Sequence, residues 1–419
     1  MLRPYQKYIL FFIIYFLLHY LEGLPPTGGL SFAQVWKLPL LAALLLYNIL
    51  SLWKKTYFEK FSYLLSIEYI LSPEILINPI NAIVRISKQL PFILFYGFWR
   101  QFFAHRKETL EKILYGLAQF ISLASAVVLL GIVHPMNGYL TAESFGIENL
   151  VYYSCVFGAP HAASSYFVAS TLVLFNGFIT RRFKSRWSKI FNATLIAISL
   201  ISVFRAYVRT GWLMLAIGLL FFIKINRITK RQLNITLLAV TLCISGILYL
   251  YNTNEAFYAR LTGKNVYTHT GGNSIDTGGS GRTVFWKNAV ENLWAADSPY
   301  ATLFGQGFTK VADDNYRTTG MHVFSHNQFL DALSQNGVIG LFLLLAFFGS
   351  LWRFICQKQG IHKRLCMSLF VSSVVFAFFQ NEMYFDYAVI FSLAVAILEC
   401  EDKEYNIEVN EYDKNEYQE

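Results

Sequence analysis

The chain has few charged residues for its size. Of its 419 residues only 15% are charged, whereas 55% are hydrophobic and 17% aromatic, and the mean hydropathy is +0.41. A soluble domain carries about 25% charged residues, so this composition excludes an ordinary water-exposed surface, and with it a disordered or fibrous chain. Apolar runs of about 20 residues, the length of a membrane-spanning helix, recur throughout the chain. The composition therefore predicts an all-α polytopic membrane protein.

The chain has few cysteines and lacks several catalytic motifs, and both facts exclude classes of protein. The five cysteines show no CxxC spacing, which gives no support to a structural zinc site or a disulfide framework. The sequence has no HExxH, no GxSxG and no P-loop ending GK[ST] near its polar loop, so a metalloprotease, a serine hydrolase and ATP binding are not expected. We expect no metal, no cofactor and, despite a pI of about 9.1, no nucleic-acid partner.

The apolar runs predict about twelve transmembrane helices. Two of them are weak, because Pro73, Pro79, Arg85 and Lys88 interrupt that region, where a re-entrant or interfacial helix is an alternative. Lys and Arg cluster in five short loops, and cationic loops stay in the cytoplasm. An even number of spans puts all five on the side of the N-terminus, so both termini are expected in the cytoplasm. The predicted spans lie near residues 8–22, 35–53, 61–72, 89–104, 114–134, 162–180, 189–208, 211–225, 233–252, 335–354, 365–380 and 386–400.

This topology divides the chain into four parts. Residues 1–252 form an N-terminal bundle of about nine spans, and residues 332–400 form C-terminal transmembrane helices. Between them, residues 253–331 are expected to form a large extracytoplasmic loop domain, with an amphipathic helix that carries Trp286 on its aromatic face. Residues 401–419 are expected to be an acidic, disordered cytoplasmic tail.

Three arginines are candidate phosphate ligands. Arg205 and Arg209 are four residues apart, so they are expected to share one helix face at the outer end of a span, where the positive-inside rule does not call for arginine. A guanidinium fork matches phosphate oxygens, although snorkelling to lipid headgroups is the alternative. Arg282 opens the amphipathic helix, where the helix N-terminus and an arginine together favour an anion.

One histidine is a candidate general base. His326 lies where the polar loop returns to the membrane, and a neutral imidazole can accept a proton from a hydroxyl near pH 7. We interpret His161, Asn327 and Trp286 as candidates that line the same cavity. A structural role is the alternative for each of these residues.

The order of these segments resembles the O-antigen ligase and O-antigen polymerase superfamily of bacterial envelope glycan assembly. The resemblance covers roughly residues 195–350. It rests on Arg205-Ala-Tyr-Val-Arg209-Thr-Gly-Trp212, Gly281-Arg282-Thr-Val-Phe-Trp286, Leu303-Phe-Gly305-Gln-Gly307, Ser325-His-Asn327 and Gly337-Val-Ile-Gly340.

The resemblance implies a metal-independent inverting glycosyltransferase in the bacterial inner membrane, with its active site facing the periplasm. Its donor is a polyprenyl-diphosphate-linked glycan, and its acceptor is a second glycan or the lipid A core. By resemblance, Arg209 and Arg282 bind the diphosphate and His326 is the essential loop histidine, while the choice between Arg205 and Arg209 as main ligand stays open. We expect a repeat-unit polymerase. Ligation to lipid A, transfer to a protein serine and lipid-linked glycan transport are the alternatives.

Overall fold

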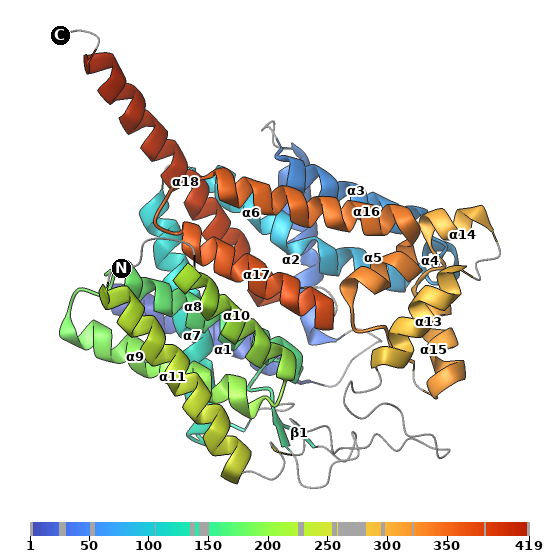
Figure 1. The fold of residues 1–419 in the computed structure, drawn as a ribbon, viewed down its shortest axis with the longest axis horizontal. Coiled ribbons are helices and arrows are strands. Elements are labelled where there is room, and N and C mark those ends of the chain that lie inside the picture. The colour runs from blue at the N-terminus through green and yellow to red at the C-terminus, as the bar shows by residue number, and fades with distance from the viewer. Residues whose placement is uncertain are drawn as a thin grey trace.

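The computed structural model describes residues 3–24, 31–50, 55–104, 106–134, 139–141, 151–224, 230–253, 258, 282–294, 298–320, 322–380 and 383–416. This part of the chain is almost entirely helical, as the sequence predicts (Figure 1). The helices are α1 (Pro4–Leu21), α2 (Phe32–Leu50), α3 (Tyr57–Leu71), α4 (Glu74–Ile77), α5 (Pro79–Gln89), α6 (Pro91–Phe102), α7 (Lys107–Leu129), α8 (Pro160–Ile179), α9 (Arg186–Arg205), α10 (Arg209–Lys224), α11 (Lys230–Thr253), α13 (Arg282–Trp294), α14 (Pro299–Phe304), α15 (Phe308–Thr319), α16 (Gln328–Gln357), α17 (Lys363–Phe379) and α18 (Phe385–Glu416). Two short strands, β1 (Tyr139–Thr141) and β2 (Val151–Tyr153), pair antiparallel with Tyr139 opposite Tyr153.

Each of the twelve segments predicted to span the membrane contains a helix. In the described residues, five helices are both long and apolar enough to cross a bilayer, namely α2, α7, α8, α9 and α16. The chain is therefore an all-α membrane protein, while the number of twelve spans stays a prediction. Helix α5 is short and begins at a proline, in the region where the sequence left an interfacial helix open.

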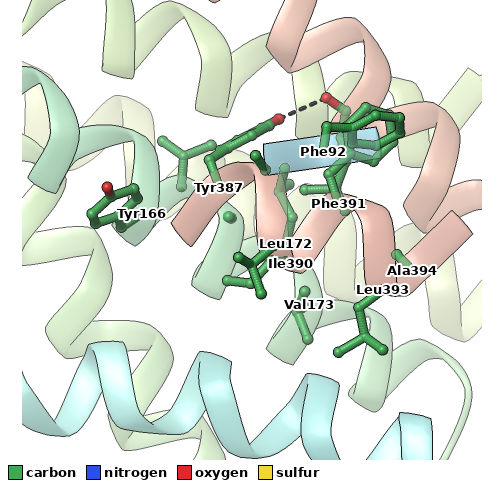
Figure 2. Close-up of a cluster of buried hydrophobic side chains, with 14 of the residues drawn as sticks. Phe92, Tyr166, Leu172, Val173, Tyr387, Ile390, Phe391, Leu393 and Ala394 are labelled. Carbon is green, nitrogen blue, oxygen red and sulfur yellow. Dashed lines mark hydrogen bonds between the residues drawn. The ribbon is translucent and has the colours of Figure 1, made fainter. Parts of the chain in front are cut away.

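The core of the bundle forms around the first half of α18, which packs against α6, α7, α8 and α17. Figure 2 shows Phe92 of α6 against Phe391 of α18, with ring centroids 5.0 Å apart. Tyr387 donates a hydrogen bond of 2.6 Å to the Leu369 carbonyl of α17, so its hydroxyl is satisfied inside the apolar cluster. These contacts hold the first turns of α18 against α6 and α17.

Serine allows the other helices to approach each other closely. Ser122 of α7 lies 2.7 Å from both Ser170 of α8 and Ser199 of α9, measured between hydroxyl oxygens. Small hydroxyl side chains at helix contacts are typical of membrane bundles, where lipid removes most of the hydrophobic drive for association. The three helices are consequently tied together at their middles.

The acidic C-terminal segment is helical as far as Glu416, so the predicted disorder is wrong for residues 401–416, while residues 417–419 lie outside the described part of the chain. Helix α18 continues to Glu416, beyond the membrane-spanning part expected from the sequence, and projects from the bundle (Figure 1). Ion pairs support this extension: Lys403 Nζ lies 3.0 Å from Glu399, and Lys358 Nζ lies 2.9 Å from Asp402. Acidic residues that gain basic partners one turn away or on neighbouring helices favour the helical state.

Candidate functional site

Three helices bring their ends together at one end of the bundle. Helices α8 and α10 run parallel, because a Cβ on Gly211 would meet Ser164, and one on Gly218 would meet Leu172. Helix α17 runs antiparallel to α10, since the Ser372 hydroxyl donates to the Met214 carbonyl at 3.0 Å and the Ser368 hydroxyl donates to the Gly218 carbonyl. The first turns of α8 and α10 and the last turn of α17 therefore lie at the same end.

Helix α13 joins that end to the segment that precedes α16. The indole Nε1 of Trp286 donates to the Ser325 carbonyl at 2.9 Å. The Trp286 ring also packs at 5.6 Å against Phe378, in the last turn of α17. Arg282, the first residue of α13, stands one turn before Trp286. Figure 1 shows α13, α14 and α15 grouped at this end, away from the projecting part of α18.

Hydrogen bonds fix the segment that carries His326. The Asp331 carboxylate accepts from the Ser325 backbone N–H at 3.0 Å and from its hydroxyl at 2.7 Å. Asn327 is the N-cap of α16, and its side-chain oxygen accepts from the N–H groups of Phe329 and Leu330. This is the capping chemistry expected of asparagine. Asn327 is therefore buried as part of the loop scaffold, and its predicted place in a cavity wall stays a prediction.

His326 itself adopts a left-handed backbone conformation with φ of 53°. Few residues other than glycine do so, and the conformation costs of order 1–3 kcal/mol unless the surroundings impose it. Here the fixed residues on both sides impose it. In the described part of the chain, His326 Nδ1 is buried and has no hydrogen-bond partner, so this nitrogen is available to accept a proton.

The surroundings of His326 keep its imidazole neutral. Burial and, to a smaller extent, the positive charge of Arg282 lower the pKa of His326 from 6.5 to about 4, while the side chain of Gln380 opposes them. Burial disfavours the charged form, and so does a neighbouring cation. The structure thus brings together His326 and Arg282, which the sequence singled out separately, and adds Gln380, which it missed.

Arg85 of α5 is a second contributor that the sequence analysis did not assign to the site. Its guanidinium carbon lies 3.9 Å from the Phe308 ring centroid and 4.0 Å from that of Phe324, two residues before His326. Arg85 is only 7% exposed, and cation–π contacts of this kind strengthen when they are desolvated. The available signal was an arginine inside a short amphipathic segment that begins at Pro79.

Two glycines of the resembling segments have a geometric role. Gly305 and Gly337 have φ of 79° and 68°, in the region that favours glycine. A Cβ on Gly305 would lie 2.1 Å from the Gln335 carbonyl oxygen, and one on Gly337 would lie 2.3 Å from that of Leu303. The end of α14 therefore packs backbone to backbone against the kink in α16, which positions the His326 segment relative to the outer helices.

The remaining predicted site residues lie near the same end but are arranged differently from the expectation. Arg205 and Arg209 do not share a helix face: α9 ends at Arg205, Tyr207 has φ of 52°, and α10 begins at Arg209. The positive φ breaks the helix between them. Arg205 is exposed, with its guanidinium carbon 5.7 Å from the Tyr153 ring centroid. His161 lies in the first turn of α8, at the same end.

One group of possible metal ligands occurs in the described residues, and it lies elsewhere. Glu111, His362 and Glu401 approach each other near the start of α17, at the opposite end from His326. Their groups already have protein partners, since Arg182 pairs with Glu111 and His362 Nδ1 lies 2.8 Å from Glu401. The prediction that the candidate site uses no metal remains untested.

Part of this architecture matches a known protein family. Residues 194–345, from α9 to the middle of α16, match the model of the family described as O-antigen ligase. This segment is similar to the O-antigen ligase family. The resemblance to the O-antigen ligase and polymerase superfamily is thereby confirmed. No curated protein matches the chain.

The segment matched to the O-antigen ligase family contains Arg205, Arg209, Arg282 and His326, whereas Arg85 and Gln380 lie outside the matched residues. Members of this family are glycosyltransferase-like enzymes that act in membranes on lipid-linked glycans and their acceptors. The chain is accordingly a multi-pass membrane protein. The helices outside the matched segment supply part of the scaffold around His326.

Proposed function

We propose that this protein is a membrane glycosyltransferase that uses a polyprenyl-diphosphate-linked glycan as donor and extends a surface polysaccharide. The observation that carries the proposal is a buried, neutral histidine beside an arginine in the segment matched to the O-antigen ligase family. An acceptor hydroxyl is a weak nucleophile, so a positioned base that removes its proton assists attack on the anomeric carbon. The imidazole of His326 is held in the form that such a base requires.

The proposed step balances as a single displacement. The acceptor oxygen bonds to the anomeric carbon of the donor sugar, and the bond from that carbon to the diphosphate oxygen breaks. The hydroxyl proton passes to His326, and the polyprenyl diphosphate leaves with its negative charge held by Arg282 and Arg209, with Arg205 assisting. Attack from the face opposite the leaving group inverts the anomeric centre. Preorganised cations at the developing charge supply a role that a metal ion has in other transferases.

Repeat-unit polymerisation is the proposed outcome, and ligation to the lipid A core is the alternative. The name of the matching family favours the ligase, since it states that activity. Both reactions share the donor, the leaving group and the residues proposed above. The two differ in the acceptor alone, so a purified protein offered each acceptor in turn distinguishes them.

The arginine assignment has a direct test in lysine substitutions. Arg209→Lys and Arg282→Lys keep the charge but lose the bidentate fork, so each variant should lose about 10- to 100-fold of its transfer rate. Arg317→Lys is the matched control, because Arg317 is 78% exposed on α15 and pairs with Asp314. The measurement is product formation from lipid-linked donor in chelator-treated buffer. Unchanged rates in both site variants, or a strict need for a divalent cation, would reject the mechanism.

The proposed orientation has a separate test. The site is proposed to face the periplasm, with both termini in the cytoplasm. Reporter fusions after Trp187 and Arg231 should report the cytoplasm, and a fusion after Thr277, which lies outside the described residues, should report the periplasm. A cytoplasmic signal after Thr277 contradicts the use of an exported lipid-linked donor at this site.

A further inference from the structure

A pocket between α2, α5 and α8 is not used by the mechanism proposed above. It has a volume of about 350 Å³ and is lined by α2, α5, the start of α6, α8 and the loop between α17 and α18. We call it the lysine pocket. Its lining residues are Ser31, Ala33, Gln34, Lys37, Leu38, Leu41, Val84, Ser87, Lys88, Pro91, Tyr166, Met383, Tyr384 and Phe385.

The chemistry of the lysine pocket suits an amphiphilic anion. Its walls are mainly apolar, and its charged lining groups are Lys37 and Lys88, with no acidic side chain among the described lining residues. Lys37 Nζ is held 2.7 Å from Glu22 and 5.1 Å from the centroid of the Phe385 ring. An ammonium group has three donors, so this pairing leaves Lys37 able to bind a second anion. Lys88 is exposed at the pocket.

The charges behind Lys37 form a fixed network. Glu22 also faces His19, whose Nε2 lies 2.9 Å from Asp386, and Tyr15 donates to the same Asp386 carboxylate. These groups come from α1 and α18 and hold Glu22 from behind. The Lys37 ammonium is therefore positioned by packing, and a bound anion would not need to order it.

Two smaller cavities share lining residues with the lysine pocket or with the segment that supports His326. The first shares Lys88 and Met383 with the lysine pocket and also contacts Gln328. The second shares Gln328 with the first and is lined by Arg85 and Asp331, the residues that support the loop before α16. The lysine pocket and the start of α16 are therefore separated by a few side chains, among them Lys88 and Gln328.

Helices α2 and α5, which line the lysine pocket, also carry exposed apolar side chains. Val35 of α2 is 50% exposed, and Ile80 and Ile83 of α5 are 68% and 56% exposed. In a membrane protein such residues face lipid chains, so the helices beside the pocket border the lipid from which a substrate with a long chain would come. The volume of about 350 Å³ is near the lower limit for ligand pockets. It fits a phosphate and the first units of one chain better than the several acyl chains of a glycolipid core.

We propose that the lysine pocket binds the phosphate end of a polyprenyl-phosphate-linked acceptor, while Arg209 and Arg282 bind the diphosphate of the donor. This inference rests on the proposed function and specifies its acceptor. A polymerase joins two lipid-linked chains, so it needs one phosphate site for the donor lipid and one for the acceptor lipid. Only the donor lipid is separated from its glycan in the reaction. The acceptor keeps its phosphate bond and presents its far sugar hydroxyl to His326.

The test uses radiolabelled undecaprenyl phosphate as probe and the full-length protein in phosphatidylcholine nanodiscs. The wild type should bind two probe molecules. Lys88→Gln should weaken one of them about tenfold, as expected for loss of a charge-assisted contact, and Lys88→Arg should restore it. Lys37→Gln tests the same site, although it strips the partner from the buried Glu22. Lys287→Gln is the control, since Lys287 is 71% exposed on α13 and should leave both sites intact.

Competition identifies the source of the phosphate. Phosphatidylglycerol, inorganic pyrophosphate and lipid A are each added to the occupied wild type. Failure of all three to displace the probe from the Lys88-dependent site supports the proposal. Equal displacement by phosphatidylglycerol or pyrophosphate shows a general anion site, and preferential displacement by lipid A shows a ligase acceptor site; each overturns it. If the wild type binds one probe molecule and Lys88→Gln binds it equally well, the lysine-pocket proposal is overturned, while the proposed function stands. If Arg282→Gln still binds both probe molecules as tightly as the wild type, the result counts against the proposed function instead.

Discussion

The pH dependence of transfer follows directly from the surroundings of His326. A free histidine has a pKa near 6.5, whereas burial and Arg282 lower the pKa of His326 to about 4. A group with a lowered pKa keeps its neutral form as the pH falls, and loses it only near the lowered value. Because the neutral imidazole is the base, kcat/KM should stay high until the pH approaches 4. An unperturbed histidine would lose activity near 6.5.

The expected difference is large at pH 5.5. With a pKa of about 4, about 97% of His326 is neutral at that pH, compared with about 9% for a pKa of 6.5. The two cases differ about tenfold in the amount of active base. The same shift has a stability consequence of fixed sign: stability that depends on the neutral histidine is present above pH 6.5 and is lost as the pH falls through about 4.

The assay is transfer from lipid-linked donor in proteoliposomes, with kcat/KM measured between pH 4 and pH 8. Arg282→Gln should lower the rate and move the acid limb upward, but only part of the way, because burial is the larger cause of the shift. Arg317→Gln, on the exposed face of α15, should leave the limb in place. A wild-type limb near 6.5, or an identical limb in the residual activity of His326→Gln, would refute the assignment of His326 as the base.

Two further substitutions test how the structure holds the site. Gly337→Ala places a Cβ 2.3 Å from a backbone carbonyl oxygen at a positive φ, so it should lower the free energy of unfolding by more than about 2 kcal/mol. In the same helix, the Cβ of Gly349→Ala meets nothing within 4 Å, so this control should leave thermal unfolding unchanged. Trp286→Phe removes the hydrogen bond to the Ser325 carbonyl, worth about 1 kcal/mol, and should reduce kcat several-fold, whereas Trp294→Phe, at an 82% exposed position, should have no effect on transfer. Equal effects within either pair contradict the contacts described.

The features that the sequence predicted depend on local pattern. Apolar runs of about 20 residues predict helices wherever they occur, and all twelve segments contain one. Arg282 opens a helix, as predicted from the pattern of apolar residues that follows it. The order of short polar segments around His326 was sufficient to identify the superfamily, which the match to residues 194–345 confirms.

The features that the sequence did not predict depend on contacts between distant segments. Arg85 contacts Phe324, which lies 239 residues later in the chain. No local sequence pattern predicts a contact over that separation. The helix break between Arg205 and Arg209 depends on Tyr207, which has a positive φ. Tyrosine rarely adopts this conformation, so the residue type did not predict the break. Likewise, the acidic tail looks disordered in isolation, but Lys358 and Lys107, which are distant in sequence, pair with Asp402 and Glu404 in its first turn.

The position of Arg282 couples the two halves of the proposed reaction. In the free protein its charge depresses the pKa of His326, so the histidine is neutral but a weak base. A donor diphosphate bound to Arg282 brings negative charge that offsets this effect, so the pKa of His326 should rise and proton removal should become easier. The pH profile of kcat, which reports the complex, should therefore have its acid limb at a higher pH than that of kcat/KM, which reports the free protein. The base becomes stronger when the leaving group is in place, which discourages proton transfer before the donor has bound.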